Sequence, residues 1–261
     1  MVENVVAVEA PERPVSVSMP RPGYSLLWLL LFVALYFGGS ILYFGGYAFS
    51  VVIQNMDKVG NPDFQSMIQE SVMQHAKSAS GISGMYLVQF VLLIPFILLA
   101  SNFKTQPWKK TLGFRKTSSK SLGLWLLILA GFIALQMLVD SFLNVQTADF
   151  MKGVNGSKSL ALISVFLVIA PLLEEMVLRG YLFKSWRHTR LGLTGTLLVT
   201  SVLFTLMHLG QYGLIQYVFL FTLSILLGLA RERTGSLWTP IVLHSANNLL
   251  PALAVIYLGL A

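Results

Sequence analysis

The sequence predicts an all-α fold, a polytopic bundle of seven or eight transmembrane helices. Of its 261 residues, 55% are hydrophobic and only 11% are charged, whereas soluble domains carry about 25% charged residues. Several apolar runs are long enough to cross the roughly 30 Å hydrocarbon core of a bilayer. Ionisable residues within these runs cluster in the last four, so we expect the active site to lie there.

Residues 1–23 are predicted to form a flexible cytoplasmic tail. They include three glutamates and four prolines but few large apolar side chains, a composition typical of disordered segments. A signal peptide would begin with basic residues followed directly by an apolar stretch, and this segment does not. Residues 24–261 are then expected to form a single membrane-embedded domain.

Seven apolar stretches predict the spans by their length and lack of charge. The last stretch contains Pro251, which can break it into two short helices and give eight spans. The predicted spans are residues 25–53, 82–101, 122–144, 159–184, 192–209, 213–230 and 236–260.

The distribution of basic residues predicts the orientation. With the N-terminus in the cytoplasm, most of the 18 lysine and arginine residues fall in cytoplasmic segments, as the positive-inside rule requires. The net charge of +7 is thereby explained without a nucleic-acid partner. We expect a multi-pass protein of a bacterial plasma membrane. The chain has no cysteine, which excludes disulfides, a cysteine nucleophile and thiolate metal ligands.

The pair Glu174–Glu175 lies within the apolar run 159–184, four residues before Arg179. Each ionised carboxylate at mid-membrane costs about 2.5–3.5 kcal/mol on insertion scales, so such residues indicate a function. Glu175 and Arg179 are separated by one helical turn and can pair. Glu174 points about 100° away from Glu175 around the helix, so the two carboxylates can have different roles.

Two more pairs with the same i, i+4 spacing occur in later spans: Phe204 with His208, and His244 with Asn248. A carboxylate in a membrane cavity can act as a general base, and a histidine can share its water or bind a metal. A second histidine and an asparagine can stabilise an oxyanion. Together with Glu174, these residues suit amide hydrolysis without a covalent intermediate.

The three pairs resemble the motifs of the intramembrane proteases grouped as CaaX proteases and bacteriocin-processing enzymes, also called the Abi family. The resemblance covers roughly residues 160–250. The matching runs are Glu174-Glu175-Met-Val-Leu-Arg179 for Glu-Glu-x-x-x-Arg, Phe204-Thr-Leu-Met-His208 for Phe-x-x-x-His, and His244-Ser-Ala-Asn-Asn248 for His-x-x-x-Asn.

This resemblance implies an eight-helix bundle with a cavity open toward the cytoplasm. It also implies a role for each motif residue. Glu174 would activate the hydrolytic water with His208, Glu175 would be paired with Arg179, and His244 and Asn248 would stabilise the oxyanion.

The sequence leaves open whether a metal takes part. Glu174, His208 and His244 could bind Zn²⁺ with water in the open position. The same residues can also work without a metal, as a glutamate-dependent hydrolase, which is the interpretation we prefer.

We therefore expect an intramembrane endopeptidase that cleaves a membrane-associated or hydrophobic peptide. Two alternatives remain. A catalytically silent membrane scaffold or bacteriocin-immunity protein could keep the same fold, and a small transporter could use the carboxylates for protons or cations. The short Gly-x-Ser-Gly pattern around Ser83 resembles that of rhomboid proteases, but Ser83 begins a span far from the polar cluster.

Overall fold

The computed structural model describes residues 22–102, 107–146 and 148–260. Within these ranges the regular elements are helical and no strand occurs, which agrees with the all-α prediction. The first helix begins at Pro22. The tail predicted for residues 1–23 therefore lies, up to residue 21, outside the described residues.

Helices joined by short turns make up the described chain. The first part holds α1 (Pro22–Gln54), a 3₁₀ turn (Met56–Lys58), α2 (Phe64–Lys77), α3 (Ala79–Ser101), α4 (Trp108–Leu112), α5 (Ser119–Phe142) and α6 (Asp149–Lys152). The second part holds α7 (Leu160–Ser164), α8 (Ala170–Glu175), α9 (Phe183–Trp186), α10 (Gly192–Leu206), α11 (Leu214–Thr234) and α12 (Trp238–Pro251). Three π-helical turns continue these helices: Val165–Ile169 between α7 and α8, Met176–Leu182 between α8 and α9, and Ala252–Tyr257 after α12.

The protein is an integral, multi-pass membrane protein. In the described residues, six helices are long and apolar enough to span a bilayer: Gly23–Gln54, Ala79–Ser101, Ser119–Phe142, Leu160–Trp186, Leu214–Thr234 and Trp238–Tyr257.

Six of the predicted stretches form helices long enough to span a bilayer, and the seventh forms a shorter one. The stretch predicted at 192–209 is the apolar helix α10, whose 15 residues extend only about 22 Å at 1.5 Å per residue. This is shorter than the roughly 30 Å of hydrocarbon. Pro251 does not divide the last span, because the helix continues from Trp238 to Tyr257.

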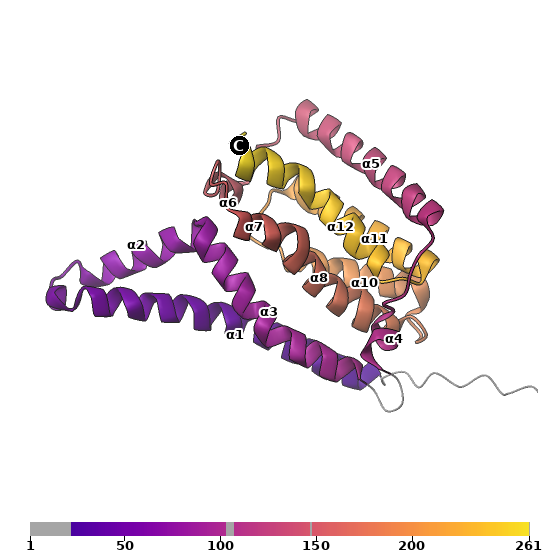
Figure 1. The fold of residues 1–261 in the computed structure, drawn as a ribbon, viewed down its shortest axis with the longest axis horizontal. Coiled ribbons are helices and arrows are strands. Elements are labelled where there is room, and N and C mark those ends of the chain that lie inside the picture. Colours follow the sequence, from indigo (N-terminus) through magenta and orange to yellow (C-terminus); the bar gives the residue numbers. More distant parts are fainter. Residues whose placement is uncertain (1–21, 103–106, 147, 261) are drawn as a thin grey trace, which may run out of the picture.

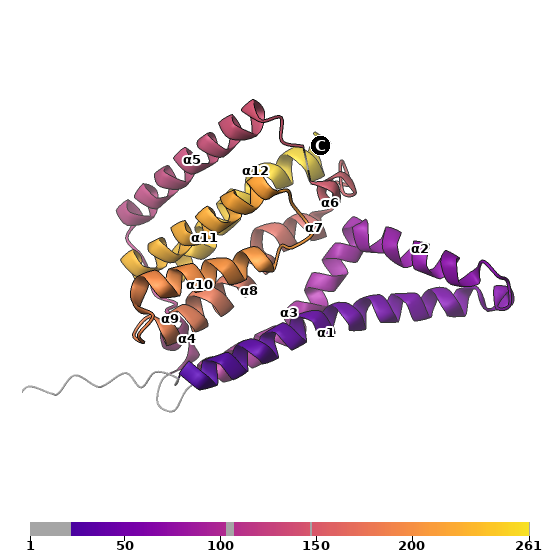
Figure 2. The same ribbon diagram turned by 180° about the vertical axis from the view of Figure 1, so that it is seen from behind.

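The continuous helix Leu160–Trp186 lies inside the bundle. It packs against α3 on one side and against α10 and α12 on the other. The helices α1, α2 and α3 form an arm that projects from the bundle, and α5 covers the far side of α11 and α12 (Figures 1 and 2). The polar motifs thus fall on helices that contact one another in the centre.

The bundle has two chemically different ends. We call the basic end the one that holds α4, the turn 187–191 and the junction of α11 with α12, because lysines and arginines gather there. The opposite end holds the connection 143–159 and the turn 207–213. Counted together with the shorter α10, which leads from the basic end to the opposite end, the six long helices run between these ends in alternating directions (Figure 1).

The largest apolar core surrounds the second half of the long helix. Its fully buried members include Leu112, Leu178, Leu182, Phe204 and Leu237. By contrast, α5 exposes large apolar side chains along its length, and only 6% of its most apolar stretch is buried. A surface of this kind is typical of contact with lipid rather than water. The buried core, not the lipid-facing surface, therefore holds the polar motifs in place.

Candidate active site

The two glutamates lie on α8, between two π-helical turns. A π turn inserts one extra residue into the helix and leaves some backbone carbonyls without their usual helical partner. In the second turn, the amide of Phe183 donates to the carbonyl of Leu178. The carbonyl of Arg179 instead accepts a hydrogen bond from Nε of Arg231, at 3.2 Å. The turn that carries Arg179 is thus held from a neighbouring helix.

Glu175 is paired with two neighbouring side chains, Arg179 and His244. Its Oε1 accepts from Nη1 of Arg179 at 3.0 Å, the ion pair that the i, i+4 spacing predicts, and lies 3.0 Å from Nδ1 of His244. Arg179 also donates through Nη2 to both the carbonyl and the hydroxyl of Ser224. Glu175 and Arg179 are both fully buried, so this network is shielded from solvent.

Glu174 has a different environment. Its side chain is 7% exposed and its Oε2 lies 3.9 Å from Nε2 of His244, too far for a hydrogen bond. The same oxygen has no hydrogen-bond partner among the described residues. His244 therefore lies between the two carboxylates, bonded to Glu175 and near Glu174. The two glutamates differ in their surroundings, as their positions on the helix predict.

The Phe204 ring lies where the three motifs meet. It is fully buried, and the guanidinium of Arg179 lies over its face, 5.1 Å from the ring centre. The rings of His208 and His244 lie 5.0 and 5.5 Å from it. The backbone carbonyl of Phe204 is 2.9 Å from Nδ1 of His208. Since a carbonyl only accepts, Nδ1 carries the proton, and in neutral His208 Nε2 holds the lone pair.

Asn248 is held by a backbone carbonyl that Pro171 leaves without its helical hydrogen bond. Proline has no backbone N–H, and the amide of Ala170 donates to Val165, so the carbonyl of Phe166 is left free of helical bonds. Nδ2 of Asn248 donates to this carbonyl at 3.0 Å. Asn247 then donates to Oδ1 of Asn248 at 3.3 Å. The carboxamide is thereby fixed beside the cavity described next.

A small cavity of about 70 Å³ brings these groups together. It is lined by Tyr86, Phe150, Phe166, Ala170, Glu174, Phe204, His208, Gln211, Leu220, Leu223, His244, Asn247 and Asn248. Glu175 and Arg179 do not line it and support its wall from behind. Such a volume has room for a few water molecules next to polar groups.

The position of this cavity bears on the expected cytoplasmic opening. Several lining residues belong to the opposite end of the bundle, among them Phe150 in the connection 143–159 and Gln211 in the turn 207–213. If the positive-inside rule sets the orientation, this half of the bundle faces outward. With that orientation the cavity would lie in the outer half, and the cytoplasmic opening that the resemblance implies stays a prediction.

Comparison with known proteins bears on this arrangement. A family model described as "Type II CAAX prenyl endopeptidase Rce1-like" matches residues 156–250. These residues form an Rce1-like domain of the CaaX protease and bacteriocin-processing family. The matched residues include all three motifs and the whole of the long helix Leu160–Trp186.

One curated relative is a protein of Escherichia coli described as an uncharacterized 24.3 kDa protein. It is 32% identical over 114 residues, which cover 41% of this chain and 52% of the relative. The match thus spans about half of the relative's length. No solved structure matches the chain.

Several residues near the candidate site around Glu174 were not predicted from the sequence. Tyr86 and Phe150 come from outside the matched domain, and Ser224 contacts Arg179 through a helix without a recognisable motif. Tyr212 stacks edge-on against Phe150, and burial and the nearby charge of Glu174 raise the pKa of Tyr212. The sequence offered one signal for these residues: the turn 207–213 carries further polar side chains directly after His208.

The candidate site around Glu174 does not fit a metal as it is arranged. Among the described residues, no three histidine, aspartate or glutamate side chains converge as a set of metal ligands. His244 is bonded through Nδ1 to Glu175, and its Nε2 is 3.9 Å from Glu174. We therefore derive no step through the zinc ion considered for Glu174, His208 and His244.

Two other polar residues are separate from the candidate site around Glu174. Ser83 is buried and donates to the carbonyl of Ala79, one turn earlier in the same helix. This hydrogen bond satisfies the Ser83 hydroxyl within its own helix, so its burial needs no catalytic explanation. Asp140 lies near the end of α5, away from the cavity lining.

Proposed function

We propose that this protein is an intramembrane endopeptidase that hydrolyses a peptide bond of a membrane-associated or hydrophobic peptide with water activated by Glu174. One observation carries the proposal. Of the two buried glutamates, Glu174 lines the cavity, whereas Glu175 does not and is held through Oε1 by Arg179 and His244. Oε2 of each glutamate has no hydrogen-bond partner among the described residues, but only Glu174 presents its carboxylate to the cavity. A carboxylate in this setting can accept a proton from water.

The proposed reaction needs a base, a donor for the oxyanion and a proton for the leaving amine. Glu174 takes a proton from water while the water oxygen attacks the carbonyl carbon of the substrate. The carbonyl oxygen becomes an oxyanion, which collapses as the C–N bond breaks. Protonated Glu174 then returns its proton to the leaving nitrogen, so that one water is consumed and two chain ends form.

His208 can orient the attacking water. Its Nδ1–H is used by the carbonyl of Phe204, so the lone pair of Nε2 can accept a hydrogen bond from the water. This arrangement supports a pair of groups, Glu174 and His208, acting on one water molecule.

His244 and Asn248 can stabilise the oxyanion. His244 lies between the two carboxylates, with Nδ1 3.0 Å from Glu175 and Nε2 3.9 Å from Glu174, so Nε2 is the ring nitrogen placed to donate to an oxyanion in the cavity. The amide of Asn248 uses one hydrogen for Phe166 and has a second to donate. Donors held in place before the reaction are the effective ones, because they need no reorganisation.

We further propose that the protein lies in the plasma membrane of a bacterium with its N-terminus in the cytoplasm. The crowding of basic residues at one end of the bundle supports this orientation. The cavity then lies in the outer half of the membrane and receives peptides from that side or from the bilayer itself.

The decisive experiment compares the membrane and secreted peptides of three strains. They produce wild-type protein, Glu174→Gln and His208→Ala at equal levels. We expect at least one peptide pair, uncleaved and cleaved, to shift to the uncleaved form in both variants. A phenotype fully complemented by the variants, with no peptide changed, would instead establish a non-catalytic scaffold. Substrate flux in proteoliposomes, lost in Glu175→Gln, would establish a transporter.

A further inference from the structure

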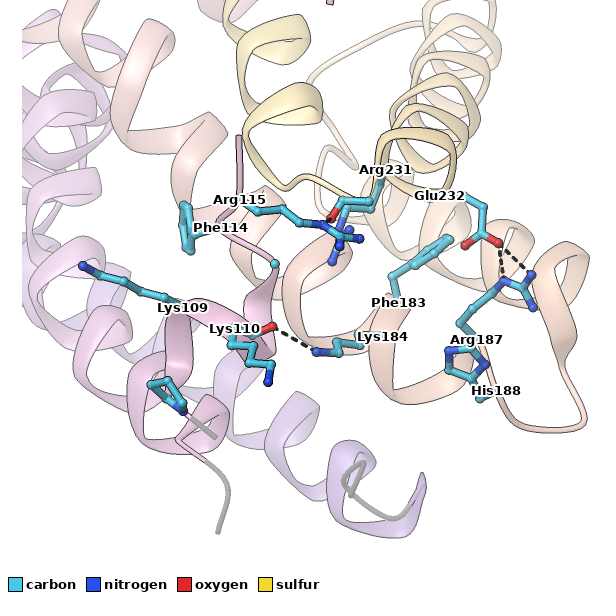
Figure 3. Close-up of a pocket in the computed structure, with 13 residues that line it drawn as sticks. Lys109, Lys110, Phe114, Arg115, Phe183, Lys184, Arg187, His188, Arg231 and Glu232 are labelled. Carbon is cyan, nitrogen blue, oxygen red and sulfur yellow. Dashed lines mark hydrogen bonds and ion pairs between the residues drawn. The ribbon is translucent and has the colours of Figure 1, made fainter. Parts of the chain in front are cut away.

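A second cavity lies at the basic end, away from the candidate active site. It has a volume of about 630 Å³, within the range of sites for small organic ligands. We call it the basic pocket. It is lined by Pro107, Lys109, Lys110, Gly113, Phe114, Arg115, Phe183, Lys184, Arg187, His188, Arg231, Glu232 and Gly235 (Figure 3).

Positive charge dominates this lining. Six lysines and arginines face one carboxylate, Glu232. That carboxylate is already occupied, since Nε and Nη2 of Arg187 donate to its Oε1 at 2.9 and 2.7 Å. Among the described residues, no other salt bridge involves the pocket's lining. An excess of cations remains that an anion from outside could neutralise.

Three of the five remaining cations contact backbone carbonyls rather than charges. Nε of Arg115 donates to Gly235, Nη2 of Arg231 to Leu112, and Nζ of Lys184 to Lys110. Carbonyls hold these side chains in position but leave their net charge in place. Figure 3 shows Arg115 and Arg231 side by side, with Lys184 reaching toward α4.

Two glycines make room for the guanidinium groups. A Cβ on Gly113 would lie 2.3 Å from Nη2 of Arg231, and one on Gly235 would lie 1.8 Å from Nη2 of Arg115. Both glycines also have positive φ, +83° and +63°, which other residues rarely adopt. Arg231 is only 8% exposed. Arg231 is thus packed into the protein as part of a formed site, whereas Arg115 is exposed and is held against Gly235 by its hydrogen bond to the carbonyl.

The pocket's surroundings indicate the depth of lipid headgroups. Trp108 and Trp238 flank Phe114, with ring centres 5.6 and 5.1 Å from it, and tryptophans gather at membrane interfaces. The spans that contribute Phe183 and Arg231 end here. Phe114 and Phe183 add apolar surface beside the cations. A ligand with an anionic head and an apolar body matches both features.

We propose that the basic pocket binds the phosphate group of an anionic phospholipid from the adjoining leaflet. Basic pockets between spans on the cytoplasmic side are suited to such headgroups. The inference does not depend on the protease proposal, because the pocket shares no residue with the cavity around Glu174.

The test measures lipid binding by the purified, delipidated full chain with native mass spectrometry and with lipid-dependent melting. The probes are dioleoylphosphatidylglycerol, the zwitterionic dioleoylphosphatidylcholine and inorganic phosphate. We expect saturable binding of one phosphatidylglycerol, a raised melting temperature, and weaker effects of the other two probes. Inorganic phosphate binding as tightly as the anionic lipid would overturn the lipid as the source and leave free phosphate as the ligand.

The matched variants are Lys184→Gln and Arg115→Gln, with Lys120→Gln as the control. Glutamine keeps a donor for each backbone carbonyl, so folding should be retained, which the melting temperature without lipid checks. At about 1 kcal/mol per surface cation, each variant should bind phosphatidylglycerol about fivefold more weakly and the double variant about 25-fold. Lys120 is an exposed cation at the same end outside the lining, and its loss should change little. Unaltered binding in the double variant would overturn the proposal.

Discussion

Oε1 of Glu175 forms the ion pair with Arg179, and the same oxygen lies 3.0 Å from Nδ1 of His244. One carboxylate oxygen thus joins the Glu-Glu-x-x-x-Arg and His-x-x-x-Asn motifs across two helices. This contact fixes the ring of His244 beside Glu174. In the proposed mechanism Glu175 accordingly positions His244, and Glu174, which lines the cavity, acts on water.

Glu174→Gln should abolish turnover with little loss of stability. The substitution removes the base but keeps the shape, and general bases contribute about 10²–10⁴-fold to rate. The measurement is cleavage of an identified substrate by purified protein, together with its melting temperature. Glu70→Gln, the same chemical change on the exposed surface of α2, is the control and should retain full activity. Cleavage by Glu174→Gln at the wild-type rate would contradict the assignment of the base.

Arg179→Met should destabilise the protein by about 3–5 kcal/mol, because it leaves Glu175 charged and buried without its partner. Replacing both residues, in Arg179→Met with Glu175→Met, should lose less than the sum of the two single changes. Equilibrium unfolding in detergent measures all four proteins of this cycle. Strict additivity would show that the pair contributes no coupling.

Gly180→Ala should lower stability through overpacking. Its Cβ would lie 2.9 Å from Leu112 and 3.3 Å from Leu237, two fully buried side chains. Such insertions cost about 1–3 kcal/mol. Gly131→Ala in α5 is the matched control, because its Cβ would meet nothing within 4 Å and alanine favours the helix. Equal melting temperatures for the two variants would argue against tight packing at Gly180.

Labelling of single introduced cysteines should establish the orientation of the protein in the membrane. The chain has no cysteine of its own, so no native residue would react with the label. Ser157→Cys is exposed at the opposite end and Lys120→Cys at the basic end. A membrane-impermeant maleimide should label the first in intact cells and the second only after permeabilisation. The reverse pattern would invert the topology and return the cavity to the cytoplasmic side.

Acidification should loosen the contact between α2 and α1. The ring of His75 stacks on Tyr47 at 3.8 Å, and Nε2 lies 3.0 Å from the hydroxyl of Tyr43. Burial lowers the pKa of His75 from its ordinary 6.5. The undocked state therefore binds the proton more tightly, so the stabilisation is full above about pH 6.5 and falls as the pH drops below it.

Hydrogen exchange of α2, corrected for intrinsic pH effects, measures this loosening between pH 7.5 and 5.5. His75→Phe keeps the stack on Tyr47 and should remove the pH dependence. An equally large response in the phenylalanine variant would assign it to another group.

The hydrophobic runs predicted the helices well, because span length and lack of charge are local properties of the sequence. At 192–209 the helix is present but ends earlier than the apolar stretch: Met207 and Leu209 lie in a turn that leads to Gly210, whose φ is +80°. Hydropathy does not register such a turn. The continuity of the last helix through Pro251 was equally invisible, since neighbouring helices and π turns can accommodate a proline.

The candidate site was predictable within each helix but not between helices. Spacing placed Glu175 and Arg179 on one face, and their pair is present. The contact of His244 with Glu175 and that of Asn248 with Phe166 depend on tertiary packing and on π turns, which shift every following residue around the helix axis. The catalytic roles of all these residues stay predictions.

The short helix α10 has a consequence for the lipid around it. Its apolar length of about 22 Å ends at the polar turn that carries His208 and Gln211, beside the cavity. A bilayer next to so short a hydrophobic stretch adapts by thinning locally. We therefore expect water and headgroups to penetrate deepest along α10. An extended peptide could then leave the hydrocarbon beside α10, where water can form hydrogen bonds with its backbone groups.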